Sequence, residues 1–290
     1  MSIIGAGRVG QTLGRMAREA GYQIGDVICR SSRSARAAAR FVGGGRPGSR
    51  AEASLSATDL VLISCPDDEI GDAVELIKCN QGCIGPSVVL HTSGALDSRV
   101  LKSLKRFGMN TGSCHPLQTF VTPAGALEMI QSTSTFFCIE GDRRATLAAR
   151  RFVRDIRARY FQISTESKGL YHSAAVLASG GVVALVSKSL DLLVQCGLSE
   201  HEARRVLLPL VSGTVANLSA LGPARALTGP LRRADVGTVR RNLGSLTNVD
   251  AKAAELYRLL ADQGLSLAER AGTDQESLAR LKSVLSKRRS

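Results

Sequence analysis

A glycine motif within the first ten residues limits the folds open to this chain more than any other feature. Gly5, Gly7 and Gly10 form G-x-G-x-x-G between an apolar run, SIIGA, and a stretch with apolar residues at helical spacing. In such a strand–turn–helix the first glycine allows a tight turn, the second lets a pyrophosphate reach the backbone, and the third lets helix and strand pack closely. A glycine turn without a ligand is the alternative. We expect a dinucleotide site formed by Gly5, Ala6, Gly7, Arg8, Val9 and Gly10.

The rest of the first half predicts a sheet around this motif. Short β-rich runs alternate with helical stretches, which is the pattern of a parallel sheet covered by helices. The strand candidates are SIIGA, QIGDVIC, DLVLISC, SVVLH, NTGSCH, TFFCIE and RYFQI. DLVLISC and SVVLH are almost entirely apolar, so we place them at the centre of the sheet. We expect an α/β fold, a Rossmann doubly wound, mostly parallel sheet, over residues 1–163, with a mobile surface loop at residues 43–49.

The second half has a different character. After Ile163 the β signal ends, and residues 164–290 have the pattern of an all-α domain. A long apolar stretch runs from about Ser167 to Cys196 and ends at Gly197, a typical glycine after a helix C-terminus. We therefore predict a helical C-terminal domain that begins with one long helix.

Capping signals divide the remaining helices. Ser199 and Glu202 form a capping box for the next helix, which Pro209 should kink. The segment GPARALTGPLRRAD is expected to be a loop because of its prolines. The final helices are predicted at about Val249–Ala271 and Asp274–Lys287.

The end of the second predicted strand indicates which dinucleotide binds. Enzymes that use NAD place a carboxylate there to bind the ribose 2′-hydroxyl, whereas the turn CRSSRS of this chain has no acid. A guanidinium and hydroxyls suit the dianionic 2′-phosphate, because arginine makes forked, charge-assisted hydrogen bonds. A solvated basic turn is the alternative. We expect NADP(H), held at this end by Arg30, Ser31, Ser32 and Arg33.

Two further segments border this site in the sequence. Asp26 lies earlier in the second strand and is the only local residue that would favour NAD. DLVLISC ends at Cys65, and Pro66 follows it, where a dinucleotide passes the carboxyl end of the sheet, so we add both residues to the cofactor site. Asp67 or Asp68 is expected to cap the helix that follows.

Polar residues also follow two later strands, on the side where an α/β sheet binds ligands. SVVLH is followed by Ser93 and Gly94, and NTGSCH ends at His115, with Gln118 shortly after it. We expect these four residues to contact a substrate near the nicotinamide. For His91 or His115 taken singly, a hydrogen-bonded structural role is an equal alternative.

The long helix adds a lysine and a histidine, Lys168 and His172. Their spacing places both side chains on one helix face, and a lysine is costly to bury without a purpose. In ketone reduction, hydride adds to carbon while charge grows on oxygen, so an ammonium can donate the proton and an imidazole can orient the carbonyl. The alternative has Lys168 reaching solvent and His172 as a satisfied core residue.

These motifs together resemble a known group. GAGRVGQTLGRMAREAG, CRSSRSARAAA, DLVLISCPDDEI, VVLHTSGALDSRVL, GSCHPLQTF, KGLYHSAAVLASGGVVALV and ALTGPLRRADVGTV resemble, in order, bacterial predicted oxidoreductases that pair a Rossmann-like domain with domain of unknown function 2520. That group is similar to the 6-phosphogluconate and β-hydroxyacid dehydrogenases and to ketopantoate and pyrroline-5-carboxylate reductases. The resemblance implies a helical domain like the C-terminal one of 6-phosphogluconate dehydrogenase, and a homodimer joined through it.

The resemblance also implies roles for single residues. Many of those relatives carry a K-x-x-x-N pair whose lysine is an acid or base, so Lys168 would take the place of the lysine and His172 that of the asparagine. Ser93 and Gly94 fall near their substrate-binding serine loop. In the group the segment after TGP reads R-G-D and a histidine follows; the chain departs from this with Arg232-Arg233-Ala234-Asp235 and Asn242.

Composition excludes several other classes. With 44% apolar and 22% charged residues, no signal-peptide pattern and no apolar run near ~20 residues, we expect a soluble cytoplasmic protein that meets no membrane. The seven cysteines form no C-x-x-C pair, so we expect reduced, buried thiols and no metal. The net charge of +13 comes with only 4% aromatic residues, so nucleic acid is an unlikely partner, and an anionic cofactor explains part of the charge.

The sequence therefore predicts an NADP(H)-dependent oxidoreductase acting on a small carbonyl or hydroxy compound, first of all an oxo or hydroxy acid. Lys168 would be the proton donor or acceptor. The alternative is a non-catalytic NADP(H)-binding regulatory or partner-binding protein, because such a domain fixes the ligand and not the reaction. Ketopantoate reductase is a narrower alternative by fold-level analogy.

Overall fold

The computed structural model describes residues 1–51, 53–85, 87–132 and 135–286, and it divides into two compact units, Met1–Gly180 and Gly181–Ser290. The predicted boundary at residue 163 follows the last strand, whereas the first unit continues through α7 (Lys168–Val176). The reason is that Lys168, the first residue of α7, is buried and bonded to a strand of the first unit.

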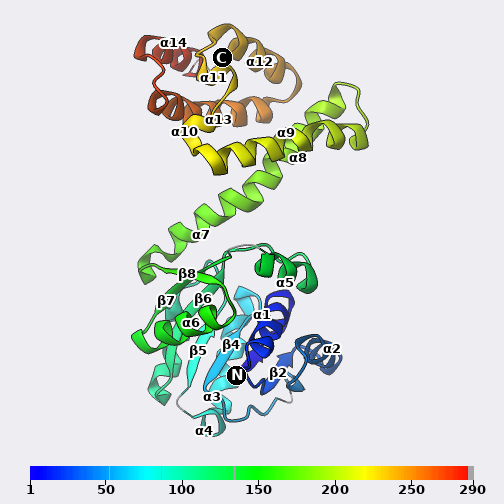
Figure 1. Ribbon diagram of the computed structural model, residues 1–290, viewed down its shortest axis with the longest axis vertical. Coiled ribbons are helices and arrows are strands. Elements are labelled where there is room, and N and C mark those ends of the chain that lie inside the picture. Colours follow the sequence, from blue (N-terminus) through cyan, green and yellow to red (C-terminus); the bar gives the residue numbers. More distant parts are fainter. Residues whose placement is uncertain (52, 86, 133–134, 287–290) are drawn as a thin grey trace. The chain divides into compact units, whose positions relative to one another are not determined.

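The first unit contains one eight-stranded sheet (Figure 1). Its order is β3-β2-β1-β4-β5-β6-β7-β8, and every neighbouring pair is parallel except β6 and β7. The strands are β1 (Ser2–Ile4), β2 (Asp26–Cys29), β3 (Arg46–Ser49), β4 (Leu60–Ile63), β5 (Val88–His91), β6 (Asn110–Pro116), β7 (Phe136–Gly141) and β8 (Arg159–Gln162). The predicted Rossmann sheet is confirmed, with β4 and β5 at its centre.

Helices cover both faces of this sheet. One face carries α1 (Arg8–Glu19), α2 (Ser32–Val42), α5 (Pro123–Ser132) and α6 (Arg143–Asp155). The other carries α3 (Ile70–Cys79) and the 3₁₀ segment Ser98–Phe107, and the short α4 (Gln81–Ile84) follows α3. This arrangement leaves the carboxyl ends of β1, β2, β4, β5 and β6 along one edge, where α/β sheets bind ligands.

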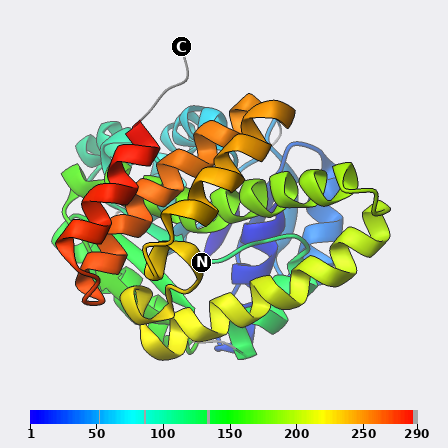
Figure 2. The ribbon, with the colours of Figure 1, turned by 90° about the horizontal axis from the view of Figure 1, so that it is seen from above.

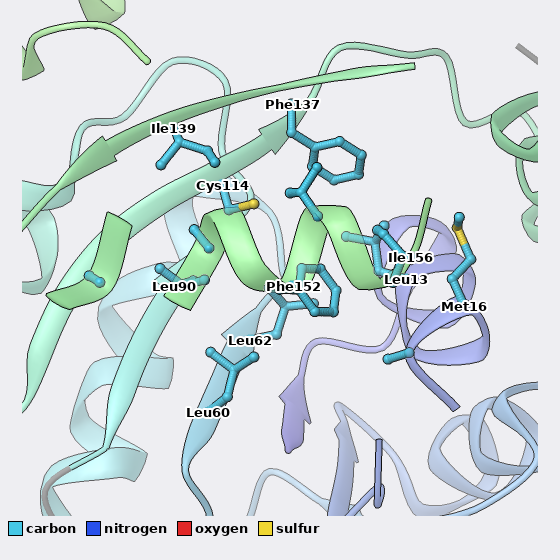
Figure 3. Close-up of a cluster of buried hydrophobic side chains, with 14 of the residues drawn as sticks. Leu13, Met16, Leu60, Leu62, Leu90, Cys114, Phe137, Ile139, Phe152 and Ile156 are labelled. Atoms are coloured by element: carbon cyan, nitrogen blue, oxygen red, sulfur yellow. The ribbon is translucent and has the colours of Figure 1, made fainter. Parts of the chain in front are cut away.

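Alternation along the strands divides the core between the two faces. Leu62 of β4 packs with Phe137 and Phe152 in the cluster under α1 and α6 (Figure 3). Its neighbours Val61 and Ile63 pack against α3 on the other side. Since successive side chains of a strand point to opposite faces, a strand buried on both faces needs the continuous apolar run that predicted it.

The strand β3 corrects the sequence prediction, which placed a mobile loop at residues 43–49. Arg46–Ser49 pairs in parallel with β2, with Val27 opposite Pro47. Proline is tolerated because β3 is an edge strand with a neighbour on one side only. The guanidinium of Arg46 donates to the buried carboxylate of Asp26 at 2.8 Å, which fixes the register.

The second unit is helical, as predicted. Its helices are α8 (Val182–Gln195), α9 (Glu200–Leu221), α10 (Pro223–Ala226), α11 (Gly229–Arg232), α12 (Val236–Val249), α13 (Ala251–Arg270) and α14 (Gln275–Ser286). The capping box of Ser199 and Glu202 is confirmed, and Gly197 has the positive φ of +98° expected after a helix end. The predicted loop at GPARALTGPLRRAD is wrong in part, because it forms α10 and α11. The predicted end at Lys287 lies outside the described residues.

Two parts of the second unit differ in packing. The helices α12, α13 and α14 lie side by side (Figure 2) around a core that includes Leu243, Leu265 and Leu281. In contrast, α8 has no buried residue and α9 buries only Ala203. The pair α8 and α9 therefore presents apolar surface that this unit does not cover.

A π-helical turn, Leu177–Gly181, joins α7 to α8. Among the described residues, Thr165–Gln195 is long and apolar enough to cross a membrane by length and composition alone, with a mean hydropathy of 1.6 over its best window. The expectation that no stretch has this property is wrong. One such helix is weak evidence for a membrane span.

Candidate cofactor and active site

The three glycines after β1 adopt the geometry that dinucleotide binding requires. Gly5 has a φ of +82°, and a Cβ there would lie 2.4 Å from the backbone nitrogen of Cys65. A Cβ on Gly10 would lie 2.3 Å from the hydroxyl of Ser64, so α1 packs closely on the sheet only with glycine there. Gly7 has no such neighbour closer than 3.9 Å, which leaves its backbone open to a ligand.

The start of α1 is equally open. The helix begins at Arg8 with Gly7 as its N-cap, no side chain caps it, and its first turn has no acid. Ala6 is buried, and its carbonyl accepts a hydrogen bond from the Gln11 side chain at 3.0 Å, while Val9 packs against the core. The free amides at this helix start, with their positive end of the helix dipole, suit a pyrophosphate.

The turn after β2 exposes its basic side chains. The Arg30 side chain is 81% exposed, and Arg33 is also exposed. The hydroxyl of Ser31 accepts from the amide of Ser34 at 3.2 Å and so caps α2, while Ser32 is the first residue of that helix. Two exposed arginines and the start of α2 therefore follow β2 at the place expected for the 2′-phosphate.

An acid does reach this turn, contrary to the sequence expectation. Glu69 lies on the loop after β4, and its carboxylate is 3.8 Å from the Arg30 guanidinium. Arg50, which follows β3, binds the same carboxylate and also pairs with Asp72 at 2.9 Å. Asp26 is at the opposite end of β2 and is held by Arg46. The carboxylate able to compete for this place is therefore Glu69, which no local pattern could reveal.

The loop after β4 runs past the glycine turn. Cys65 is half-buried against Gly5, and burial raises the pKa of its thiol to about 11, so it stays protonated. Pro66 is exposed. Asp67 and Asp68 lie in a 3₁₀ turn, and the helix that follows, α3, has Glu69 at its N-cap position and no side-chain cap, so the predicted capping role is wrong. Cysteines also depart from expectation, because three are exposed: Cys79, Cys83 and Cys196.

The loop after β5 is held by its own residues. His91 is fully buried, and its Nδ1 accepts a hydrogen bond from the Ser93 amide at 3.2 Å. The Ser93 hydroxyl accepts from the amides of Ala95 and Leu96 at 3.2 and 2.9 Å. Burial, aided by the charge of Lys168, lowers the pKa of His91 to about 3. The structural role proposed as an alternative for His91 therefore agrees with the structure, and Ser93 also shapes the loop.

Lys168 is the largest charged side chain in the interior, with 1% exposure. Its ammonium donates to the Ser113 hydroxyl at 2.6 Å, and that hydroxyl lies 3.4 Å from the carbonyl of Ser93. Burial lowers the Lys168 pKa, while nearby groups such as Cys138 and Glu140 oppose the shift. Among the described residues no carboxylate forms an ion pair with it. The alternative in which Lys168 reaches solvent is wrong.

A cavity of about 670 Å³ lies beside this lysine, within the first unit. Its lining includes the polar residues His115, Gln118, Tyr171 and His172, with Thr119 and Ser179, and much of the rest comes from small or apolar residues of α7 and the turn after it. The His115 Nδ1 and the Tyr171 hydroxyl are hydrogen-bonded at 2.6 Å. Burial, with the charge of Lys168, lowers the pKa of His115 to about 3.

Gly94 lies between the two imidazoles. A Cβ on Gly94 would be 2.5 Å from Nδ1 of His172 and 2.7 Å from Nε2 of His115. The Nδ1 atom of His172 is buried with no partner among the described residues. The structure thus brings His115, Gln118 and His172 together at the cavity, with Gly94 against the imidazoles, but leaves Lys168 out of its lining. The sequence prediction missed Tyr171, whose only signal was its place between Lys168 and His172.

Two family models match this chain. A Rossmann-like domain matches residues 1–116, and a domain of unknown function (DUF2520) matches residues 135–264. The chain therefore belongs to the proteins that pair a Rossmann-like domain with this domain of unknown function. A search of curated proteins found no significant match.

Solved structures share the fold over nearly the whole chain. A protein of Thermotoga maritima is 26% identical with a TM-score of 0.74, covering 93% of this chain and 98% of that one. A Bacteroides fragilis protein, provisionally named an NADP oxidoreductase, is 23% identical with a TM-score of 0.71 and coverage of 91% and 97%. The pyrroline carboxylate reductase of Plasmodium falciparum, solved with NADP bound, is 15% identical with a TM-score of 0.58 and coverage of 97% and 97%.

Proposed function

We propose that this chain is an NADP(H)-dependent oxidoreductase that acts on a small carbonyl or hydroxy compound. One observation carries the proposal: the open glycine turn after β1 and the cavity beside the end of β6 lie at the same edge of one sheet. A dinucleotide that binds its pyrophosphate at the first can present its nicotinamide toward the second. The similar structures named for NADP or for reduction support this proposal.

The preference for NADP(H) rests on the turn after β2. Arg30 and Arg33 offer two guanidinium groups to a 2′-phosphate, whereas the competing carboxylate of Glu69 is already paired with Arg50. Titration of NADPH and NADH, followed by cofactor fluorescence, should show tighter binding of NADPH. Arg30→Ala should remove this difference, and Arg36→Ala, an exposed arginine further along α2, should keep it. Equal binding of the two cofactors by the unaltered protein would contradict the proposal.

Lys168 contributes charge to this site from behind the cavity wall. Its ammonium faces the Ser113 hydroxyl, so direct donation to a substrate would require Nζ to leave that bond, and the donor role stays a prediction. Positive charge held in a poorly solvated place stabilises negative charge that grows on a substrate oxygen. Lys168→Met should lower turnover by roughly a hundredfold and leave the NADPH dissociation constant unchanged. Lys102→Met, on the surface, is the matched control.

The main rival is a non-catalytic NADP(H)-binding regulator, with ketopantoate reductase as a narrower one. A panel of 2-oxo acids, hydroxy acids, ketones and cyclic imines, with NADPH oxidation or NADP reduction followed at 340 nm, separates these readings. Turnover of ketopantoate above all others would support the narrower rival. A protein that binds NADPH tightly and turns over none of the panel would support the regulator.

We also propose that a second copy of the chain covers α8 and α9. Val183 and Leu210 are 69% and 67% exposed, and the two helices together bury only Ala203, so their aliphatic side chains are available to a partner. A membrane is a poorer occupant, because α7 belongs to the active-site unit and α8 alone has 14 residues, short of the ~20 that a span needs. We accordingly place the protein in the cytoplasm.

Light scattering tests this dimer directly. The purified chain should have twice its monomer mass of 30.6 kDa. Replacing both residues, Val183→Glu and Leu210→Glu, should give the monomer mass, and Val249→Glu, exposed at the end of α12, should not. A monomer at micromolar concentration in the unaltered protein would contradict the proposal.

A further inference from the structure

The cavity contains a hydrogen-bonded pair that the proposed function has not used. We propose that Tyr171 is a positioning residue, which holds His115 in the neutral form protonated at Nε2, so that this N–H donates to the oxygen of the reacting carbonyl or the nitrogen of an imine. The proposal rests on the oxidoreductase function above. It assigns the contact with the reacting atom to His115 and leaves Lys168 as a source of charge.

The surroundings of His115 keep its imidazole uncharged. His115 lies between two cavity residues, Tyr171 and His172, and the ammonium of Lys168 is close enough to oppose a second positive charge. Burial is the larger effect, and His91 acts in the same direction. The pKa of His115 near 3 therefore keeps the ring neutral at any physiological pH, with a single N–H to place on one of its two nitrogens.

The hydrogen bond at Nδ1 of His115 has a defined direction. The Tyr171 hydroxyl contacts two groups, the His115 ring at 2.6 Å and the Cys138 thiol. Burial raises the pKa of Cys138 to about 11 and also raises that of Tyr171, so both remain donors. The imidazole nitrogen is a far better acceptor than sulfur. The phenol proton therefore points at Nδ1, at the short distance of 2.6 Å, and the ring proton is placed on Nε2.

The Nε2 atom of His115 is then free to donate a hydrogen bond to a substrate. This atom is not used by Tyr171, and it lies beside Gly94, whose missing side chain lets the ring approach the loop after β5. A neutral N–H in a partly buried site donates to a growing negative charge without itself becoming charged. No bond to His115 is made or broken in this role: the ring would keep its proton while the cofactor supplied hydride to the substrate carbon, and the substrate oxygen or nitrogen would take its proton from solvent.

The tautomer can be measured without cofactor or substrate. The chain has four histidines, and ¹⁵N–¹H correlation spectra of the labelled imidazoles, assigned by single replacements, distinguish Nδ1–H, Nε2–H and doubly protonated rings. His115 should show the Nε2–H pattern unchanged from pH 5 to pH 8. In Tyr171→Phe the pattern should move toward a mixture of tautomers. Tyr160→Phe on β8, whose ring faces Arg150, should leave it unchanged.

Opposite results would overturn the proposal. An Nδ1–H pattern in the unaltered protein, titration of His115 near its ordinary pKa, or an unchanged pattern in Tyr171→Phe would each do so. Once a substrate is known, Tyr171→Phe should lower kcat by roughly tenfold or more, as a wrongly placed ring proton does elsewhere, with NADPH binding preserved. Because the spectra need no turnover, a failure of the oxidoreductase function would be seen separately.

Discussion

Acid should destabilise the first unit through His91, which is buried in its neutral form. The pKa of this histidine is about 3 in the folded protein and about 6.5 in an unfolded chain. Between these values the unfolded chain binds a proton that the folded chain does not bind. The free energy of unfolding is therefore highest above pH 6.5 and falls as the pH falls toward 3.

The size of this effect follows from how the free energy of unfolding changes with pH. One group with a lowered pKa changes the free energy of unfolding by about 1.4 kcal/mol per pH unit within this window. From pH 7 to pH 5, His91 alone should therefore remove about 2 kcal/mol, a large share of the ~5–15 kcal/mol that stabilises a typical domain. His115, with a pKa also near 3, adds a smaller amount because its ring is partly exposed.

Urea titrations at pH 7, 6 and 5 measure this effect. In a Tyr257→Phe background the remaining tyrosines, Tyr22, Tyr160 and Tyr171, all belong to the first unit, so their fluorescence reports its unfolding. His91→Asn keeps an acceptor near the Nδ1 position but does not titrate, so between pH 7 and pH 5 it should lose about 2 kcal/mol less than the unaltered protein.

The matched control is His201→Asn, an exposed residue of α9, which should follow the unaltered protein. If the His91→Asn and unaltered proteins lost the same stability on acidification, the burial of a neutral His91 could not be the cause. The reasoning would also fail if His91→Asn were the more acid-sensitive of the two.

Two further substitutions test the two ends of the site. Gly94→Ala places a methyl group 2.5 Å from Nδ1 of His172 and 2.7 Å from Nε2 of His115, so it should displace both rings. Turnover should then fall by roughly tenfold or more, while the NADPH dissociation constant stays the same. Unchanged turnover would show that the imidazoles need not lie this close to the loop after β5. Glu69→Gln removes the carboxylate beside Arg30, so NADPH should bind about two- to fivefold more tightly, the effect of one partly exposed charge pair, with NADH unaffected. Weaker NADPH binding in this variant would mean that Glu69 orders the arginines instead of competing for them.

Local patterns in the sequence predicted most of the first unit. The glycine turn needs only neighbours in the chain, and the apolar runs of β4 and β5 follow from burial on both faces. The edge strand β3 was missed because RPGS is a turn-like sequence. Its extended form comes from pairing with β2 and from the bond between Arg46 and Asp26.

The helix α12 escaped prediction for a similar reason. Its sequence contains Gly237 and Gly244, which disfavour a helix. Val239 and Leu243 are nevertheless buried against α13 and α14, so tertiary packing outweighs a weak local preference. The short helices α10 and α11 likewise form where prolines occupy the first helical turns.

The site residues could be predicted only where a sequence motif marked their position. Residues after strand ends, such as His115 and Gln118, could be placed because strand ends share an edge of the sheet. Glu69 and Tyr171 could not be assigned roles, because each meets its partner only after folding. The spacing of Lys168 and His172 predicted a shared helix face, but it could not show that Ser113 would hold the lysine away from the cavity.

The proline in β3 has a consequence for how copies of this chain can meet. An edge strand with free amides and carbonyls is a template on which another chain can add a strand and begin aggregation. In β3, Pro47 lacks the amide proton and Gly48 adds no side chain to pack, so this edge is a poor template. The edge at β3 therefore disfavours strand addition, and in the dimer proposed above the copies would meet instead through side chains of α8 and α9, not through backbone hydrogen bonds.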